Sequence, residues 1–238
     1  PEAWRDLKVR QAFLYAIDRK AICEDILAST YQVLPCIVCQ PDLWPQGLND
    51  YAYDPEKAKA LLAEAGVDPA SLGTVHIITH TGYNNQPNRD ALQAMQAYLK
   101  DVGIESEVRF LDLPTWRATY RTPKMEFAYR GTRGTLFGYI FGQWLSTDKR
   151  GTAVSGYDYA ADGYDELIAR IRSASDLETY KKGLSDLCKL QNETLPDIYL
   201  WVGLRFGAAN ERVKDFYWYP APGGGPYEDH AERWYIED

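Results

Sequence analysis

One stretch of the chain decides the fold class. It runs from Thr74 to Leu111 and reads TVHIITHTGYNNQPNRDALQAMQAYLKDVGIESEVRFL. The opening TVHIITH is rich in β-branched residues and predicts a strand. The centre predicts a helix, whose inward positions at helical spacing are Leu92, Met95, Leu99 and Val102. The closing IESEVRFL alternates apolar with polar residues, as a half-buried strand does. A strand, a helix and a strand in this order most simply form a right-handed parallel crossover, which predicts an α/β fold.

The sequence before this unit predicts two helices separated by an irregular segment. In residues 53–66, Asp54 is placed to cap a helix, Pro55 fills the first helical position, and a glycine ends the helix. Residues 6–29 repeat apolar side chains near helical spacing and predict one long helix. Residues 30–52 carry three prolines and predict an irregular connection.

The sequence after the unit continues the alternation of strands and helices. We expect short helices at 113–122 and 137–146, a strand at 125–131, helices at 162–174 and 176–194, and a strand at 197–210. From Val213 the sequence is aromatic and rich in glycine and proline, which is typical of irregular structure. The sum is a mixed sheet flanked by helices.

Composition and charge narrow the classes of partner. At 238 residues, 45% hydrophobic and 25% charged, the chain is long enough for one large domain or two small ones. The formal net charge is −8 and the basic residues are spread out, which argues against nucleic acid or an anionic membrane surface as partner. The chain opens with PEAWRDLKVR, without a signal-peptide core, so we expect a part of a longer protein whose targeting signal lies upstream.

The four cysteines carry no clear catalytic or metal-binding pattern. Cys36 and Cys39 form a lone CxxC, and no second Cys or His pair stands at a matching spacing. We expect either a local disulfide between these two residues or free thiols of no catalytic consequence. Cys23 and Cys188 fall near the apolar faces of predicted helices, where buried free cysteine is common.

Several segments together resemble one known family. DLKVRQAFLYAIDRKAI at 6–22 and YAYDPEKAKALLAEAG at 51–66 resemble the start of the C-terminal lobe in family 5 extracytoplasmic solute-binding proteins. Three later segments also resemble that family in the same order: ALQAMQAYLKDVGIESEV at 91–108, GYDELIARIRSASD at 163–176 and QNETLPDIYL at 191–200. These proteins are the peptide-, nickel- and opine-type substrate-binding components of ABC importers.

The resemblance implies the C-terminal lobe of a two-lobed, type II periplasmic-binding-protein fold. We expect the lobe at residues 1–205 and a tail at 206–238 that returns toward an N-terminal lobe outside this chain. In such proteins the two lobes close by a hinge over a solute held between them. The resemblance further implies a small organic solute such as a peptide or an oligosaccharide, delivery to a membrane ABC permease, and an extracytoplasmic location, periplasmic or lipid-anchored. It implies neither catalysis nor a cofactor.

Candidate ligand-binding residues gather around one glycine-rich stretch. In peptide-binding relatives, the strand end and loop equivalent to 129–138 line the cleft and carry a Gly-Trp and then an Asp, which holds the peptide's amino group. Here Thr132 takes the place of that Trp, and no acid occurs between Glu126 and Asp148. Arg133 suits a carboxylate, a phosphate or sugar hydroxyls better. The full candidate set is Trp116, Tyr129, Arg130, Gly131, Thr132, Arg133, Trp201 and Arg205.

Each candidate also has a plainer interpretation. Alternation along a strand places Trp201 and Arg205 on one face, which suits a planar or polar solute. Trp116 lies in an amphipathic segment, where packing within the lobe is the alternative to a place in the cleft. For Arg133 the alternative is a solvated arginine or a salt bridge within the lobe. The loop HTGYNNQPN at 80–88 leads into a helix N-terminus with free amides and can also border the cleft.

Other chemistries are less well supported. His76 and His80 share a face of one strand, yet no third metal ligand is evident nearby. The glycines at 131–138 lack the Gly-Lys-Ser/Thr ending of a nucleotide-binding P-loop. No histidine stands in a nucleophile-elbow or HExxH setting. The high Tyr and Trp content keeps a carbohydrate-active enzyme or carbohydrate-binding domain open as the alternative, and a relative that signals its loaded state to a receptor is a third possibility.

Overall fold

The computed structural model describes most of the chain. The described residues are 2–38, 41–119, 127–129, 145, 162–204, 209–215 and 235–236. The short helix expected at 137–146 lies almost wholly outside them. No helix in this described part is both long and apolar enough to cross a membrane.

A three-stranded parallel sheet forms the centre of the first half. Strand β2 (Val75–His80) lies between β3 (Ser106–Leu111) and β4 (Phe127–Ala128), and both neighbours run parallel to it. Helix α4 (Gln86–Asp101) connects β2 to β3, and a short helix α5 (Leu113–Thr119) follows β3. The predicted parallel strand–helix–strand unit is therefore confirmed, as is the strand predicted at 125–131.

Helices α1 (Leu7–Ala16) and α3 (Pro55–Glu64) complete the first hydrophobic core, which we call the sheet core. The Asp54 carboxylate caps α3 by accepting a hydrogen bond from Lys57 N at 2.9 Å, as predicted. The inward side of α4 is also as predicted, since all four of its expected apolar residues are buried. The buried set includes Phe13, Leu62, Ile77, Leu92 and Leu99.

The single helix predicted for residues 6–29 is wrong. α1 ends at Ala16, because Ile17 adopts an extended backbone with φ −107° and ψ 119°. The carboxylate of Asp18 then accepts a hydrogen bond from Ala21 N at 2.8 Å and begins a new turn. That turn, α2 (Arg19–Ala21), continues as a π-helical segment, η2 (Ile22–Ile26). Asp18, a capping residue within the run of apolar residues at helical spacing, thus divides the predicted helix in two.

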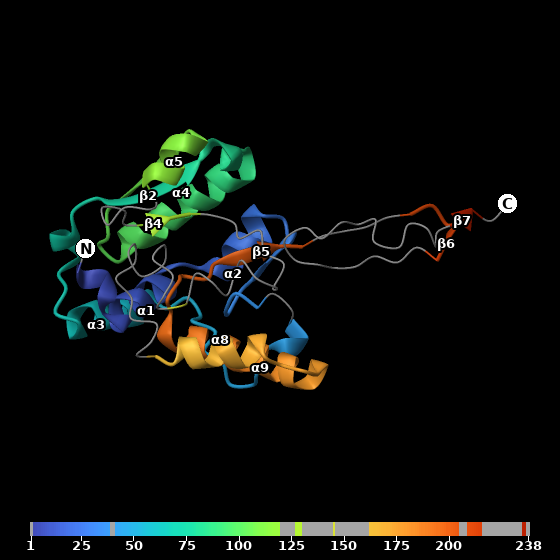
Figure 1. Cartoon of the computed structure of the whole chain (residues 1–238). Coiled ribbons are helices and arrows are strands. Elements are labelled where there is room, and N and C mark those ends of the chain that lie inside the picture. The colour runs from blue at the N-terminus through green and yellow to red at the C-terminus, as the bar shows by residue number, and fades with distance from the viewer. Residues whose placement is uncertain are drawn as a thin grey trace.

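A second hydrophobic core lies beneath a pair of helices, and we call it the helix-pair core. It packs α8 (Tyr164–Arg172) and α9 (Leu177–Thr194) against residues 34–38 and Tyr199. The two helices approach closely at Gly183, where an added Cβ would lie 2.6 Å from Ile171 Cγ1. In Figure 1 this pair lies on the opposite side of strand β5 (Trp201–Gly203) from α4 and α5. The two helices predicted at 162–174 and 176–194 are confirmed.

A disulfide joins Cys36 to Cys188, and neither alternative expected for Cys36 and Cys188 holds. Their Cα atoms are 5.2 Å apart, although the residues are separated by 152 positions in the sequence. Cys36 is therefore not paired with Cys39, and Cys188 is not a free thiol. Cys23 is a buried free thiol, as expected, and burial raises its pKa to about 11.

The guanidinium of Arg19 joins segments from both hydrophobic cores by donating hydrogen bonds to their main-chain carbonyls. Its Nη1 donates to the carbonyls of Tyr199 (2.9 Å) and Leu34 (3.3 Å), and its Nη2 donates to those of Asp50 (2.5 Å) and Tyr51 (3.2 Å). The side chain is only 4% exposed. Burial lowers its pKa to about 10, partly offset by Asp50, so Arg19 stays charged at neutral pH.

Asn192 fixes the same irregular segment from the other side. Its Nδ2 donates to the carbonyls of Pro35 (3.1 Å) and Asn49 (2.9 Å), while its Oδ1 accepts from Asn49 N (2.8 Å). The neighbouring Gln191 accepts a hydrogen bond from Ile37 N at 3.2 Å. Residues 34–37 and 49–51 are thus held by side chains from α9 as well as from α2.

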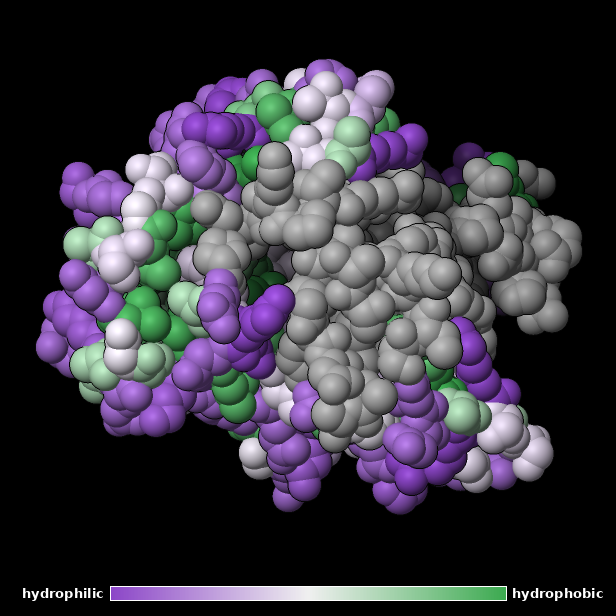
Figure 2. Space-filling model, turned by 60° about the vertical axis from the view of Figure 1, so that its left-hand side comes forward, coloured by the Kyte–Doolittle hydropathy of each residue, from purple (hydrophilic) through white to green (hydrophobic). Residues whose placement is uncertain are grey.

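Two further strand pairs complete the described structure. Strand β1 (Tyr31–Val33) pairs antiparallel with β5 (Trp201–Gly203), which confirms a strand within 197–210. Strand β6 (Val213–Lys214) pairs with β7 (Tyr235–Ile236), and Figure 1 shows this pair well apart from the other strands. Short 3₁₀ turns occur at η1 (Glu2–Arg5), η3 (Pro41–Leu43), η4 (Pro69–Leu72) and η5 (Thr81–Tyr83). On the face shown in Figure 2, the described surface is mainly hydrophilic.

Candidate functional site

Five ring side chains lie beside the parallel sheet, each in contact with the next in space, and we call them the aromatic row. The row consists of Trp116, His80, Tyr83, Tyr129 and Trp201. Successive ring centroids are 5.1 Å apart from Trp116 to His80, 4.6 Å from His80 to Tyr83, 5.7 Å from Tyr83 to Tyr129, and 6.2 Å from Tyr129 to Trp201. The first and third contacts are edge-to-face, the arrangement that the quadrupoles of aromatic rings favour.

The position of the row follows from the sheet topology. His80 ends β2, and Tyr129 directly follows β4. Because both strands are parallel, these two side chains come to the same edge of the sheet. Helix α5, which follows β3, brings Trp116 to that edge, and η5 brings Tyr83. In open α/β sheets, ligands bind outside the carboxyl ends of the strands, which is where the row lies.

Hydrogen bonds fix the far end of the row. The hydroxyl of Tyr129 donates to Asn88 Oδ1 at 3.2 Å and accepts from Trp201 Nε1 at 3.3 Å. Burial raises the pKa of the Tyr129 phenol far above its ordinary value, with the Trp201 hydrogen bond opposing that rise. The phenol is therefore protonated throughout the physiological range and keeps its proton to donate.

A glycine gives the His80 ring its place. Gly82 N donates to His80 Nδ1 at 3.0 Å. A Cβ at position 82 would lie 2.7 Å from Cε1 and 2.8 Å from Nδ1 of that imidazole. Any larger residue would displace the ring, because real Cβ atoms do not approach that closely. Gly82 therefore lets the imidazole fold back against Tyr83 and Trp116.

The row brings together three of the eight residues predicted from sequence. Tyr129 and Trp201 are both half-buried, and Trp116 is 8% exposed. The low exposure of Trp116 favours its packing interpretation, as a support for His80. The remaining candidates, which lie outside the described residues, are Arg130, Gly131, Thr132, Arg133 and Arg205.

Sequence reasoning did not select three residues of this site: His80, Tyr83 and Asn88. All three lie in the loop at 80–88 and enter the sequence analysis only in other ways. His80 was considered as a metal ligand, and the loop at 80–88 was expected to border the cleft as a whole. The useful signal was their position directly after a central parallel strand, since that position predicts the ligand-binding edge of the sheet.

The two strand histidines do not form a metal site in the described structure. His76 Nε2 lies 3.4 Å from Glu107 Oε2, whereas His80 contacts the aromatic row. The carboxylate of Glu107 also binds Arg109, and that hydrogen bond lowers its pKa. Within the described ranges, no group of three or more His, Cys, Asp or Glu residues could hold a metal ion.

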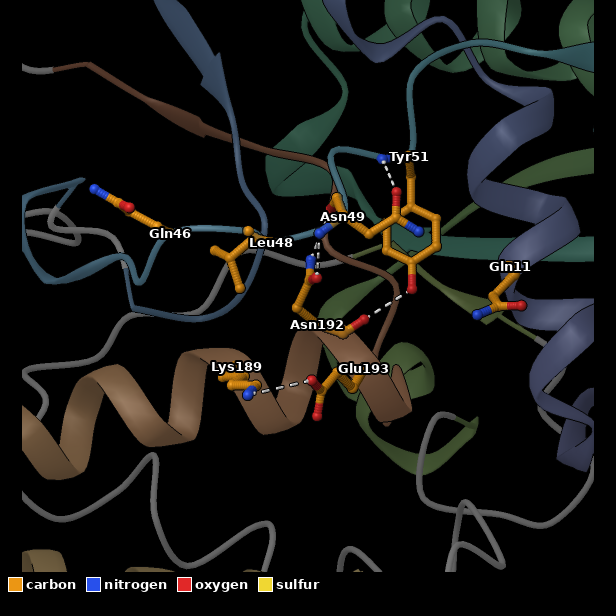
Figure 3. Close-up of a pocket in the computed structure, with 9 residues that line it drawn as sticks. Gln11, Gln46, Leu48, Asn49, Tyr51, Lys189, Asn192 and Glu193 are labelled. Atoms are coloured by element: carbon orange, nitrogen blue, oxygen red, sulfur yellow. Dashed lines mark hydrogen bonds and ion pairs between the residues drawn. The ribbon is translucent and has the colours of Figure 1, made fainter.

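A shallow polar pocket lies elsewhere, between α1, the segment 46–51 and α9 (Figure 3). Its volume of about 240 Å³ is below the range of about 300–1,000 Å³ that ligand pockets occupy. Its lining residues are Gln11, Gln46, Gly47, Leu48, Asn49, Tyr51, Lys189, Asn192 and Glu193. Several of them already bind one another: Tyr51 donates to the Asn192 carbonyl at 2.8 Å, and Lys189 lies 3.9 Å from Glu193. The pocket is better explained as the edge of the network that fixes residues 34–51.

Comparison with known families agrees with this architecture. Residues 1–151 match the family described as bacterial extracellular solute-binding proteins, family 5, middle region. The chain belongs to this family. A putative ABC transporter peptide-binding protein of Brucella ovis is 34% identical over 98% of the chain and 45% of its own length. The family 5 resemblance predicted from sequence is therefore confirmed.

Solved structures show the same fold. The oligopeptide-binding protein AppA from Bacillus subtilis, in complex with a nonapeptide, covers 100% of the chain with a TM-score of 0.73 and 22% identity. NikZ from Campylobacter jejuni, in complex with Ni(L-His), covers 98% with a TM-score of 0.70 and 20% identity. Both are type II periplasmic binding proteins, so the predicted fold class is confirmed. The chain spans about half the length of these family 5 relatives, 49% in each structure.

Proposed function

We propose that this chain is the C-terminal lobe of the solute-binding component of an ABC importer. The lobe spans residues 1–205, and the tail at 206–238 returns toward the other lobe. A small organic solute lies between the lobes and passes to a membrane permease when they reopen. The observation that carries the proposal is the aromatic row, which lies beside the carboxyl ends of β2 and β4 in a member of this family.

The chemistry of the row supports recognition and not catalysis. Its rings offer apolar faces together with hydroxyl, imidazole and indole groups, and such surfaces suit the binding of organic solutes. Tyr129 and Trp201 supply the partly exposed surface, and the buried Trp116 packs against His80. The proposed site also includes Arg130, Gly131, Thr132 and Arg133, because the family resemblance puts residues 129–138 at the cleft, and Arg205, because strand alternation puts it on the same face as Trp201. The protein needs no cofactor for this task.

The solute class follows from the relatives and from the sequence. Relatives of this chain are named as peptide-binding, and one solved relative holds a nonapeptide. A peptide, an oligosaccharide or a related organic molecule fits a surface of rings and arginines. The protein works outside the cytoplasm, in the periplasm or lipid-anchored at the cell surface. Its disulfide supports that location, because disulfides persist in oxidising compartments.

Calorimetric titration of the intact protein tests the proposal. The probes are a nonapeptide, a dipeptide, an oligosaccharide and the nickel–histidine complex. Trp201→Ala removes the end of the row, and we expect it to weaken the best-bound probe by about tenfold or more, since one lost aromatic contact is worth about 1.5 kcal/mol. Trp44→Ala is the matched control, because Trp44 packs against the helix-pair core and binds Val38 O.

Two outcomes would contradict the proposal. One is an unchanged affinity for every bound probe in Trp201→Ala, with the control behaving the same way. The other is turnover of a glycoside or peptide by the intact protein, which would place it among enzymes. Independently of the titrations, mass spectrometry of the solute that co-purifies with the intact protein identifies the natural ligand.

A further inference from the structure

We propose that Asn88 is a positioning residue for the solute site: it fixes Tyr129 and, through Tyr129, the indole of Trp201. The role in solute binding rests on the proposed function, whereas the hydrogen bonds that position Tyr129 and Trp201 do not depend on it. Asn88 lies in the first turn of α4 and is 7% exposed.

The start of α4 holds Asn88 in place. Asn85 caps the helix by accepting a hydrogen bond from Asn88 N at 3.1 Å. The backbone of Asn88 is therefore fixed by the residue that begins the helix. Its side-chain oxygen then accepts the Tyr129 hydroxyl at 3.2 Å, and the same hydroxyl accepts the Trp201 indole N–H at 3.3 Å. Three hydrogen bonds in series thus run from the cap of α4 to the end of the aromatic row.

This series crosses three elements that the backbone joins only loosely. Asn88 belongs to α4, Tyr129 follows β4 in the parallel sheet, and Trp201 begins β5 in a separate antiparallel pair. The hydrogen bonds select one orientation, because the Tyr129 hydroxyl has to serve as donor and acceptor at the same time.

The choice of asparagine is informative. A buried amide is costly unless it is hydrogen-bonded, and a leucine of the same branching would fill the position without that cost. Neighbouring inward positions of α4, Ala91 and Leu92, are apolar. A polar side chain at position 88 is therefore explained by what its oxygen accepts and not by packing of the helix.

Hydrogen exchange at the Trp201 indole tests the inference directly. The intact protein is labelled with ¹⁵N-tryptophan, and the indole N–H of Trp201 is assigned by its loss in Trp201→Phe. In Asn88→Leu we expect this proton to exchange about tenfold faster, since losing one hydrogen bond is worth about that factor. The indole of Trp44, which donates to Val38 O at 2.6 Å, is the internal control and should not change.

Two further variants separate positioning from general stability. Asn88→Asp keeps an acceptor for the Tyr129 hydroxyl, so it should leave the Trp201 exchange rate near that of the unmodified protein. Tyr129→Phe removes the shared hydroxyl and should reproduce the effect of Asn88→Leu, including in the event that Asn88→Leu does not fold. Unchanged exchange at Trp201 in the folded Asn88→Leu variant or in Tyr129→Phe would overturn the inference, as would equal effects of Leu and Asp at position 88.

Binding supplies the functional readout. For the best-bound of the four probes, affinity should fall about tenfold in Asn88→Leu and recover in Asn88→Asp. A loss of affinity that Asp does not restore would contradict positioning through the acceptor. If the unmodified protein binds none of the probes, the proposed function fails on this panel, whereas the exchange experiment still decides the role of Asn88.

Discussion

The sheet core and the helix-pair core are built from the same kinds of residue in different ways. The buried residues of the sheet core come mainly from residues 9–104, with Leu195 added, and its helices α1, α3 and α4 each begin at a side-chain cap. The helix-pair core joins residues 34–38 to helices more than 120 positions later. It is secured by a disulfide, by Asn192 and by the guanidinium of Arg19. Local caps specify the helices of the first core, whereas a disulfide and polar contacts between distant residues hold the second core together.

Loss of the disulfide should have the largest effect. Replacing Cys36 and Cys188 with serine frees a loop of 152 positions, and we expect the free energy of unfolding to fall by about 2–5 kcal/mol. Urea unfolding of the intact protein measures the change. Dithiothreitol should lower the stability of the unmodified protein toward that of the double variant. The Cys23→Ala variant keeps the disulfide, so dithiothreitol should destabilise it by the same amount. If the oxidised and reduced proteins unfold at the same urea concentration, the disulfide does not secure this core.

Removing the Arg19 guanidinium should come next. Arg19→Met leaves four main-chain carbonyls without their donor, which we expect to cost about 3 kcal/mol of unfolding free energy. Lys20→Met is the matched control, because Lys20 is exposed and its only described partner is Glu24 at 3.8 Å. Equal thermal stability of the two variants would show that Arg19 does not join the two cores.

A single methyl group tests the close contact of α8 and α9. Gly183→Ala places a Cβ against Ile171, and we expect a loss of about 2 kcal/mol from overpacking. In the background of Ile171→Ala the same substitution should cost much less, because the space is then open. Additive losses in that double-mutant cycle would indicate a cause other than the helix contact.

The smallest effect is expected in the sheet core. Asp54→Ala removes one local cap from α3 and should lower the free energy of unfolding by about 1 kcal/mol. Asp54→Asn, which keeps a capping oxygen, should remain near the unmodified value. A loss as large as that of the disulfide variant would contradict the distinction between the two cores.

The same distinction explains what the sequence could predict. Helix α3 and the unit from β2 to β3 were predicted because their caps, periods and ends lie within a few residues of each other. The break before Asp18 was missed although it has a local signal, since an aspartate that caps a turn looks like an ordinary polar residue of a helix. The partner of Cys36 could not be predicted, because nothing near either cysteine encodes a contact across 152 positions.

The candidate site divides in the same way. Tyr129 and Trp201 were selected from sequence, partly through the family resemblance, and they do lie together. Asn88 was missed because its role depends on a hydroxyl 41 positions away. From the sequence, Asn88 is only a polar residue in the first turn of a predicted helix. The fold is needed to show that its side-chain oxygen accepts a hydrogen bond from Tyr129.

The spacing of Cys36 and Cys188 also has a consequence in time. A chain made at about 5–20 residues per second reaches Cys188 roughly 8–30 s after Cys36. Of the four cysteines within residues 1–238, only Cys23 and Cys39 can pair with Cys36 during that interval. Among these four cysteines, pairings with Cys188 become available last, so segment 34–38 stays without its disulfide until α9 has been synthesised.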